Sequence, residues 1–209
     1  FSYGNEEVLK NISFCAKQGE VTALVGYSGA GKSTIGTLIP RFYDPSEGSI
    51  KIGGVNIKSI PINTLMDKIA FVFQDSDLIT DTVFNNVAMA KIGSTKEDVI
   101  KACKKARCHD FIEALSNKYD TKVGEMGVKL SGGEKQRVSI VRALSTNPRY
   151  IIADEITSSL DTKRSHQVYG YLRSYIKEKN GIGIFVSHDP IISEYADTVY
   201  TMQAGCLME

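Results

Sequence analysis

The segment GYSGAGKS, from Gly26 to Ser33, has the residue types and spacing of a phosphate-binding loop. An apolar run precedes it and a helical pattern follows, which is the context that this motif requires. Glycines let the backbone wrap closely around phosphates, so that successive N–H groups converge on the anion, and the helix start adds its positive end. Lys32 is placed to reach the β- and γ-phosphates, and Ser33 to ligate Mg²⁺. The motif predicts a nucleoside triphosphate site formed by Gly26, Ser28, Gly29, Ala30, Gly31, Lys32, Ser33 and Thr34.

Acidic and polar side chains end three further predicted strands. Asp154 follows the apolar run YIIA, and a P-loop enzyme needs such an acid near its metal. Glu155, one position on, can orient or deprotonate an attacking water. His188 follows IFVS at the carboxyl edge of the predicted sheet, where ligands bind. It is a candidate for contact with the γ-phosphate and with Glu155. The alternative is a histidine with only a structural role. Gln74 also ends a strand and is a candidate for contact with Mg²⁺ or the water.

A second glycine-rich helix start, LSGGEKQR, begins at Leu130. A serine hydroxyl and bare glycine N–H groups at a helix start favour binding of an anion. A triphosphate already held by the first loop has only its γ-phosphate free, so we expect the second start to serve a nucleotide held by another copy. Two copies packed head to tail satisfy both sites, and hydrolysis then releases the pair. The alternative, a capped helix start without a ligand, stays open on spacing alone.

The rest of the chain must position these residues, and its apolar patterns alternate between strands and helices. The predicted strands span residues 8–17, 20–26, 68–74, 150–155, 181–189 and 198–203. Helices are expected over residues 95–107, 134–147 and 162–179, and from Lys32 with Ile35, Leu38, Ile39 and Phe42 on one face. The alternation favours an α/β fold, namely a P-loop NTPase core with a mainly parallel sheet, an antiparallel β subdomain and an inserted α-helical subdomain. We expect one domain over residues 1–209, with its core at 1–74 and 148–209 and the helical subdomain at about 75–147.

Composition is that of an ordinary globular protein: of 209 residues, 42% are hydrophobic and 23% are charged. The formal net charge of +1 gives no field that would recruit nucleic acid, so a phosphate site must be built locally. Four cysteines without a C-x-x-C pair predict free thiols. No apolar run approaches the roughly 20 residues that cross a bilayer. The start at Phe1, inside a strand-like pattern, is typical of a domain excised from a longer polypeptide.

Six motifs in this order, GYSGAGKS, Gln74, LSGGE, IIADE, SSLD (158–161) and His188, resemble the nucleotide-binding domain of ABC transporters across the whole chain. The resemblance implies an ATPase that uses ATP and Mg²⁺ and acts at the cytoplasmic face of the cell membrane. Its partners would be a second such domain and the transmembrane domains, with no nucleic acid. It assigns adenine stacking to Tyr3, catalysis to Glu155, the switch to His188, the link to the membrane helices to Gln74 and dimer communication to Asp161. The signature that binds the partner's ATP would be Leu130, Ser131, Gly132, Gly133 and Glu134.

Two stretches, RFYDPSEG (41–48) and VGEMGVKLSGGE (123–134), are similar to the exporter-type branch of that family. Glu125 occupies the place of the loop residue that contacts the coupling helices. Glu134 departs from the usual glutamine and, with ARCHDFI (106–112), is similar to a siderophore-related subgroup, some of whose members import. The direction of transport therefore stays open at this point.

Two other functions compete with a transporter ATPase. One is a soluble ABC-type ATPase that acts on DNA or ribosomes, although the chain contains neither a long coiled coil nor a second cassette. The other is a regulatory module without turnover, against which the intact Glu155 and His188 argue. Sequence upstream of Phe1 with several apolar spans of about 20 residues would favour the transporter.

Overall fold

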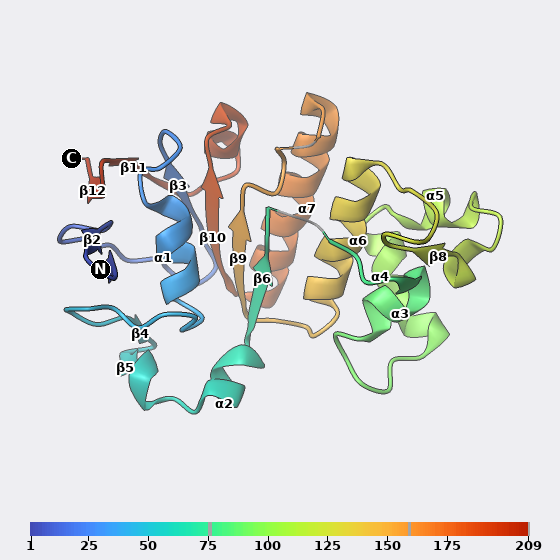
Figure 1. Cartoon of the computed structure of the whole chain (residues 1–209), viewed down its shortest axis with the longest axis horizontal. Helices are drawn as coiled ribbons and strands as arrows, with labels where there is room; N and C mark the ends of the chain where they lie inside the picture. Colours follow the sequence, from blue (N-terminus) through green and yellow to red (C-terminus); the bar gives the residue numbers. More distant parts are fainter. Residues whose placement is uncertain (75–76, 159, 209) are drawn as a thin grey trace.

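A six-stranded sheet forms the centre of the molecule in a computed structural model, which describes residues 1–74, 77–158 and 160–208 (Figure 1). Neighbouring strands are parallel, except that the edge strand β12 runs antiparallel to β11. The strands lie in the order β12 (Cys206–Leu207), β11 (Thr198–Gln203), β3 (Val21–Val25), β10 (Ile182–Ser187), β9 (Tyr150–Asp154) and β6 (Ile69–Val72). The predicted α/β fold with a mainly parallel sheet is confirmed.

Helices cover both faces of this sheet, because its inner strands bury side chains on both sides. On β9, Ile152 belongs to the apolar cluster under α1 (Lys32–Leu38). Its neighbour Ile151 belongs to the cluster under α6 (Gly132–Leu144) and α7 (Thr162–Lys179). Because β3, β6, β9, β10 and β11 run parallel, the loops that leave their carboxyl ends lie along one edge of the sheet, at the top of Figure 1.

A third apolar cluster lies in the helical part of the chain, on the right of Figure 1. Thr95 caps α4 there with a reciprocal capping box, which confirms the predicted helix start. The two-residue strands of this part pair with each other antiparallel and were not predicted. The elements are β7 (Asp81–Thr82), α3 (Val83–Ala88), α4 (Lys96–Lys105), α5 (His109–Glu113), η2 (Lys118–Asp120) and β8 (Lys122–Val123).

Short elements complete the chain: two antiparallel pairs, β1 (Ser2–Tyr3) with β2 (Glu6–Glu7) and β4 (Lys51–Ile52) with β5 (Val55–Asn56), then η1 (Ile57–Ser59), α2 (Ile62–Met66) and η3 (Pro190–Glu194).

Two predicted elements differ in the structure. The prediction of a strand over residues 8–17 was wrong, because that segment keeps an alternation of burial through Ile12, Phe14 and Ala16 but forms no ladder with a neighbouring strand. The helix from Lys32 ends before Phe42, whose side chain is exposed. No helix of the described residues is both long enough and apolar enough to pass through a lipid bilayer.

Candidate nucleotide-binding and hydrolysis site

The glycine-rich loop between β3 and α1 has a backbone that other residues would strain. Gly26 has φ of 149°, and a Cβ there would run into the backbone carbonyl of Met202. Gly31 is the N-cap of α1 with φ of 95°, and a Cβ there would lie 2.6 Å from Leu9 Cδ2. The packing of neighbouring segments therefore fixes the path of the loop through glycine. Of the other loop residues predicted to bind nucleotide, Ser28 and Gly29 are exposed and Ala30 and Thr34 are buried.

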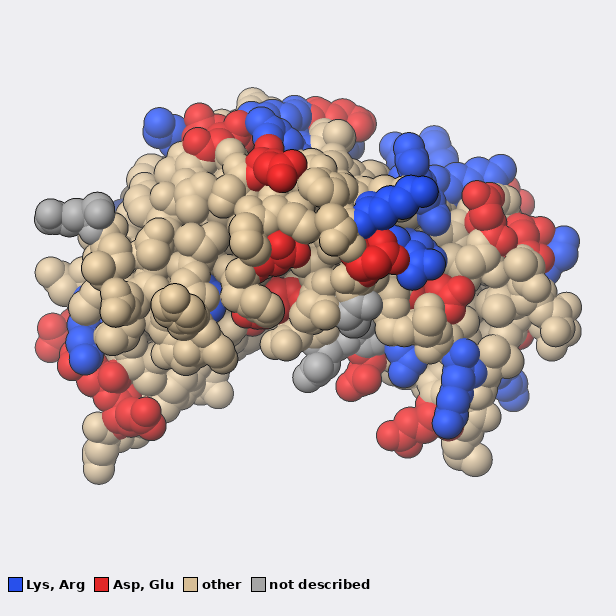
Figure 2. Space-filling view, turned by 90° about the horizontal axis from the view of Figure 1, so that it is seen from above, with Lys and Arg blue, Asp and Glu red and all other residues tan. Residues whose placement is uncertain are grey.

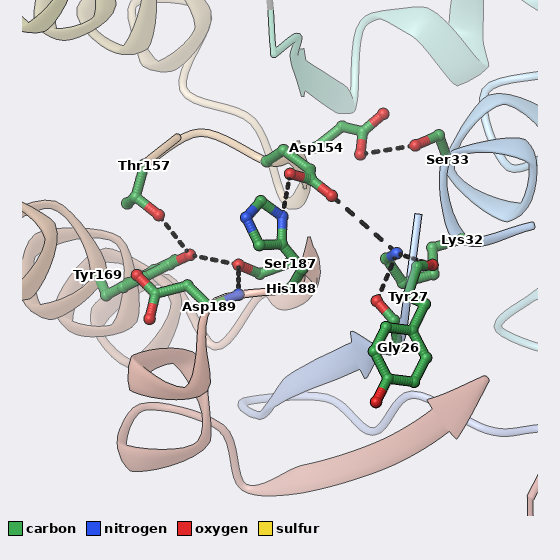
Figure 3. Close-up of polar contacts among 11 residues, drawn as sticks. Gly26, Tyr27, Lys32, Ser33, Asp154, Thr157, Tyr169, Ser187, His188 and Asp189 are labelled. Atoms are coloured by element: carbon green, nitrogen blue, oxygen red, sulfur yellow. Dashed lines mark hydrogen bonds and ion pairs between the residues drawn. The ribbon is translucent and has the colours of Figure 1, made fainter. Parts of the chain in front are cut away.

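Lys32 is almost fully buried at the start of α1, with 4% of its surface exposed. Its Nζ donates hydrogen bonds to the carbonyl oxygens of Gly26, at 2.8 Å, and Tyr27, at 2.9 Å (Figure 3). The ammonium also lies 4.0 Å from Glu155 Oε1. A buried cation needs such oxygen partners. Incoming phosphate oxygens can replace these carbonyl and carboxylate oxygens around the same Nζ.

Ser33 and Asp154 meet across the junction of α1 and β9. The Ser33 hydroxyl donates to Asp154 Oδ1 at 3.0 Å (Figure 3). Burial raises the pKa of Asp154 above its ordinary value; the Ser33 hydrogen bond acts in the opposite direction, and Glu155 adds to the rise. A hydroxyl and one carboxylate suit Mg²⁺, which typically takes one or two carboxylates and completes its shell with phosphate and water oxygens. Accordingly, residues 1–74, 77–158 and 160–208 contain no cluster of three or more His, Cys, Asp or Glu that could hold a metal alone.

Glu155 and His188 pair directly at the carboxyl ends of β9 and β10. His188 Nδ1 lies 2.5 Å from Glu155 Oε2. Glu155 has a left-handed backbone, with φ of 49°, and its N–H donates to the carbonyl of Val186 at 2.9 Å. Its side chain is 13% exposed, whereas that of His188 is 61% exposed. Such strained backbone at a non-glycine residue is typical of functional sites. The carboxylate therefore stands between Lys32 and His188.

Gln74 lies two residues beyond β6, with its side chain exposed. Among the residues that the structure describes, no hydrogen bond joins it to Asp154 or Glu155.

Tyr3, the residue predicted to stack on adenine, is exposed. Its ring packs edge-on against Phe1, at 4.8 Å between centroids, and Tyr43, at 5.1 Å. Tyr43, which packs against Tyr3, was not among the predicted site residues, although the aromatic pair in RFYDP (41–45) was an available signal for this contact.

The second glycine-rich start is a capped helix. Ser131 is the N-cap of α6, and its N–H and hydroxyl both donate to Glu134 Oε2, at 2.8 Å each. Gly133 is buried against Leu160, and Leu130 is buried before the helix. Figure 1 shows α6 beyond the β6 edge of the sheet, on the far side from α1. No hydrogen bond or ion pair of the described residues joins this helix start to the glycine-rich loop.

Asp161 also caps a helix, because its side chain accepts from the N–H of Arg164 at 2.9 Å at the start of α7. Arg164 Nη1 returns to Asp161 Oδ2 at 3.1 Å. Of the predicted SSLD motif, Ser159 lies outside the described residues. Glu125 is exposed in a turn of the helical part.

The face that carries these residues has an uneven distribution of charge. Figure 2 looks down on the carboxyl edge of the strands, with acidic side chains in the middle of the view and a larger group of Lys and Arg side chains to the right, toward the helical part. A glycine-rich loop with a buried lysine, a serine–aspartate pair and a second acid with a histidine, all at this edge, define a P-loop nucleoside triphosphatase.

A family model for the ABC transporter matches residues 9–158, and the chain belongs to this family. It is 41% identical over 209 residues to the ATP-dependent lipid A-core flippase of Syntrophus aciditrophicus (strain SB), covering 100% of this chain and 34% of the flippase. It is also 41% identical over 209 residues to the flippase of the same name from Desulfotalea psychrophila, with 100% and 36% covered. The structure of a bacterial Atm1-family ABC exporter with ATP bound aligns with a TM-score of 0.94 at 40% identity, covering 100% of this chain and 37% of that one. The chain thus spans about a third of the length of these proteins.

Proposed function

We propose that this chain is the ATPase domain of an exporter-type ABC transporter, in which two copies close around ATP and separate after hydrolysis. The observation that carries the proposal is the separation of two anion-binding features within one chain. The loop with Lys32 lies between β3 and α1, and α6, which begins after Ser131, lies beyond the β6 edge (Figure 1). No hydrogen bond or ion pair of the described residues joins the two features, so we assign the second feature to the ATP of a partner copy.

In this proposal each loop residue has a specific role in binding. Lys32 leaves the carbonyls of Gly26 and Tyr27 and binds the β- and γ-phosphates. Ser33 and Asp154 would hold Mg²⁺, with Gln74 as a further candidate ligand, and the ion would supply positive charge that offsets the charge of the phosphates. The backbone N–H groups of Gly29 through Thr34 cradle the phosphates, and Tyr3 stacks on the adenine.

Hydrolysis is assigned to the pair of Glu155 and His188. Glu155 accepts the proton of the attacking water, and His188, already 2.5 Å from this carboxylate, holds its orientation and reaches the γ-phosphate. The partner contributes the signature, Leu130 to Glu134, to the same phosphate, while Asp161 communicates between the two copies. When the γ-phosphate leaves, the contact between the copies is lost and they part.

The coupling to transport follows from the family and from the names of the relatives. We infer a core at residues 1–74 and 148–209 and a helical subdomain at about 75–147, with Gln74 and Glu125 facing the transmembrane domains. The chain then works at the cytoplasmic face of the membrane. Relatives named as a flippase and an exporter support export rather than import. They do not support a soluble ATPase that acts on DNA or ribosomes.

The test uses Glu155→Gln, which keeps the size of the side chain but removes the base. This variant should form a dimer in Mg²⁺ and ATP, measured by size-exclusion chromatography, whereas Lys32→Ala in the same background should stay monomeric. Glu178→Gln, an exposed position of α7, is the matched control and should behave as the unchanged chain.

Turnover of the unchanged chain should also rise more than linearly with protein concentration, because the site is shared. A monomer that hydrolyses ATP at the same rate per chain at every concentration would contradict the shared site. Unchanged ATP affinity in Lys32→Ala would remove Lys32 from its assigned role.

A further inference from the structure

A buried tyrosine bridges the two loops that carry Glu155 and His188. Tyr169 lies on α7 with 1% of its surface exposed. Its hydroxyl donates to Ser187 Oγ at 3.1 Å and lies 2.9 Å from Thr157 Oγ1 (Figure 3). A phenol has one proton, so donation to Ser187 leaves its oxygen to accept from Thr157. Three elements are therefore joined at one oxygen atom.

The two partners of this hydroxyl lie next to the proposed reacting groups in the sequence. Thr157 follows Glu155 by two residues, and Ser187 immediately precedes His188. The pairing of β9 with β10 ends at Asp154 and Val186, and the last backbone bond between them runs from the Glu155 N–H to Val186. Beyond that point, the tyrosine hydroxyl joins the two chain segments through Thr157 and Ser187, beside the pair of Glu155 and His188.

Ser187 extends the connection into the loop that follows His188. Its Oγ accepts the backbone N–H of Asp189 at 3.0 Å (Figure 3). His188 thus lies between Ser187, whose hydroxyl accepts from Tyr169, and Asp189, whose N–H donates to the same serine hydroxyl. Burial raises the pKa of Tyr169 above its ordinary value, so the hydroxyl keeps the proton that this arrangement needs.

The ring of Tyr169 is held independently of its hydroxyl. It stacks on Phe185, with centroids 6.1 Å apart and planes 27° apart, and it contacts the ring of Tyr195 at 5.8 Å. Removing only the oxygen therefore leaves the packing of the ring in place and separates positioning from core stability.

We propose that Tyr169 is a positioning residue for ATP hydrolysis, whose hydroxyl fixes the Glu155 loop relative to His188 through Thr157 and Ser187. It acts through these groups and not on the nucleotide. The proposal rests on the proposed function, because Glu155 and His188 are the groups that it positions. Displacements of a reacting group by about 1 Å cost up to roughly 100-fold in rate, which gives the scale of the expected effect.

The main test compares Tyr169→Phe with Tyr175→Phe in steady-state ATP hydrolysis. Tyr175 lies on the same helix and also uses its hydroxyl, which donates to the Pro148 carbonyl at 3.2 Å, away from both loops. We expect Tyr169→Phe to lower kcat by about 5- to 100-fold with KM for ATP within twofold, because Lys32 and Ser33 are untouched. Tyr175→Phe should leave both constants within twofold.

Two partner variants extend the comparison. Thr157→Val and Ser187→Ala should each lower kcat, and combining either with Tyr169→Phe should add little, because all three act through one hydroxyl. A kcat of Tyr169→Phe within twofold of the unchanged chain, equal losses in Tyr175→Phe, or a higher KM at unchanged kcat would each overturn the assignment. Thermal unfolding followed by circular dichroism sets a working temperature at which all variants are folded.

A second readout does not depend on turnover. The ring resonances of His188 in a histidine-labelled chain should shift in Tyr169→Phe and stay in place in Tyr175→Phe. Unmoved resonances in Tyr169→Phe would refute the positioning role even in a chain that hydrolyses ATP. Absence of ATP hydrolysis by the unchanged chain, together with shifted resonances, would instead count against the proposed function alone.

Discussion

Replacing Gly133 with alanine tests whether the second glycine-rich start is an assembly surface or only a helix start. Gly133 is in the first turn of α6, and a Cβ there would lie 2.8 Å from Leu160 Cδ2 and 4.0 Å from Arg164 Cδ. Alanine gains roughly 0.8–1 kcal/mol over glycine inside a helix. Moving the Leu160 side chain away from its rotamer costs about 0.5–1.5 kcal/mol. The two effects nearly cancel, so we expect the free energy of unfolding to change by less than about 1 kcal/mol.

The effect on the ATP-bound dimer should be much larger. A free chain relaxes by turning Leu160 aside, but Leu160 immediately precedes Asp161, which we assign to communication between copies. If the dimer needs Leu160 in its resting position, each copy carries an overpacking cost of about 1–3 kcal/mol in place of the 0.5–1.5 kcal/mol of the turned side chain, a difference of about 0.5–1.5 kcal/mol per copy. Twice 0.5–1.5 kcal/mol is about 1–3 kcal/mol, which weakens dimerisation by about 5- to 150-fold.

The assay is sedimentation of Gly133→Ala in a Glu155→Gln background with Mg²⁺ and ATP, beside urea unfolding of the same chains. Gly170→Ala is the control, because a Cβ there meets Tyr195 Cε1 at an ordinary 3.6 Å. It should stabilise α7 by about 1 kcal/mol and leave the dimer unchanged. A Gly133→Ala dimer within twofold of the control would refute the reasoning.

Three further predictions concern stability. Asp197 accepts the Val21 N–H at 2.9 Å and pairs with two basic side chains of α7; burial acts to raise its pKa, but these partners hold the pKa below its ordinary value. Its contribution is therefore present at neutral pH and lost as the pH falls through the lowered pKa, so Asp197→Asn should cost about 1 kcal/mol at pH 7 and progressively less below pH 3.8 in urea titrations. Leu172→Ala, at a fully buried position, should cost about 2–5 kcal/mol in the same titration. Thr95→Ala should cost about 1 kcal/mol through the lost cap of α4, with unchanged ATP affinity by calorimetry.

The sequence predicted the central elements well because their hydrophobic patterns are long and each fits only one type of secondary structure. The amphipathic run over residues 162–179 became α7 with the same bounds, and the apolar runs over 150–155 and 181–189 became β9 and β10. Residues 8–17 carry an equally clear alternation, but a strand also needs a neighbour to pair with, and a local pattern contains no information about one. The two-residue strands β7 and β8 are too short for any periodicity.

The candidate site likewise contains residues that the sequence predicted and one that it could not predict. The motifs predicted that Lys32, Ser33, Asp154, Glu155 and His188 would lie together, and the structure brings them together at one edge of the sheet. The roles of these residues stay predictions. The hydroxyl of Tyr169 could not be found from the sequence, because a tyrosine on the inner face of a helix reads as core, and its partners come from two other elements.

The contacts of Lys32 have a consequence for the affinity with which the free chain binds ATP. Its ammonium already has two carbonyls and a carboxylate as neighbours, so measured affinity is a difference between new contacts and those given up. Glu155→Gln removes the charge of one such competitor. That variant should therefore bind ATP with higher affinity than the unchanged chain, and this gain is separate from its loss of hydrolysis.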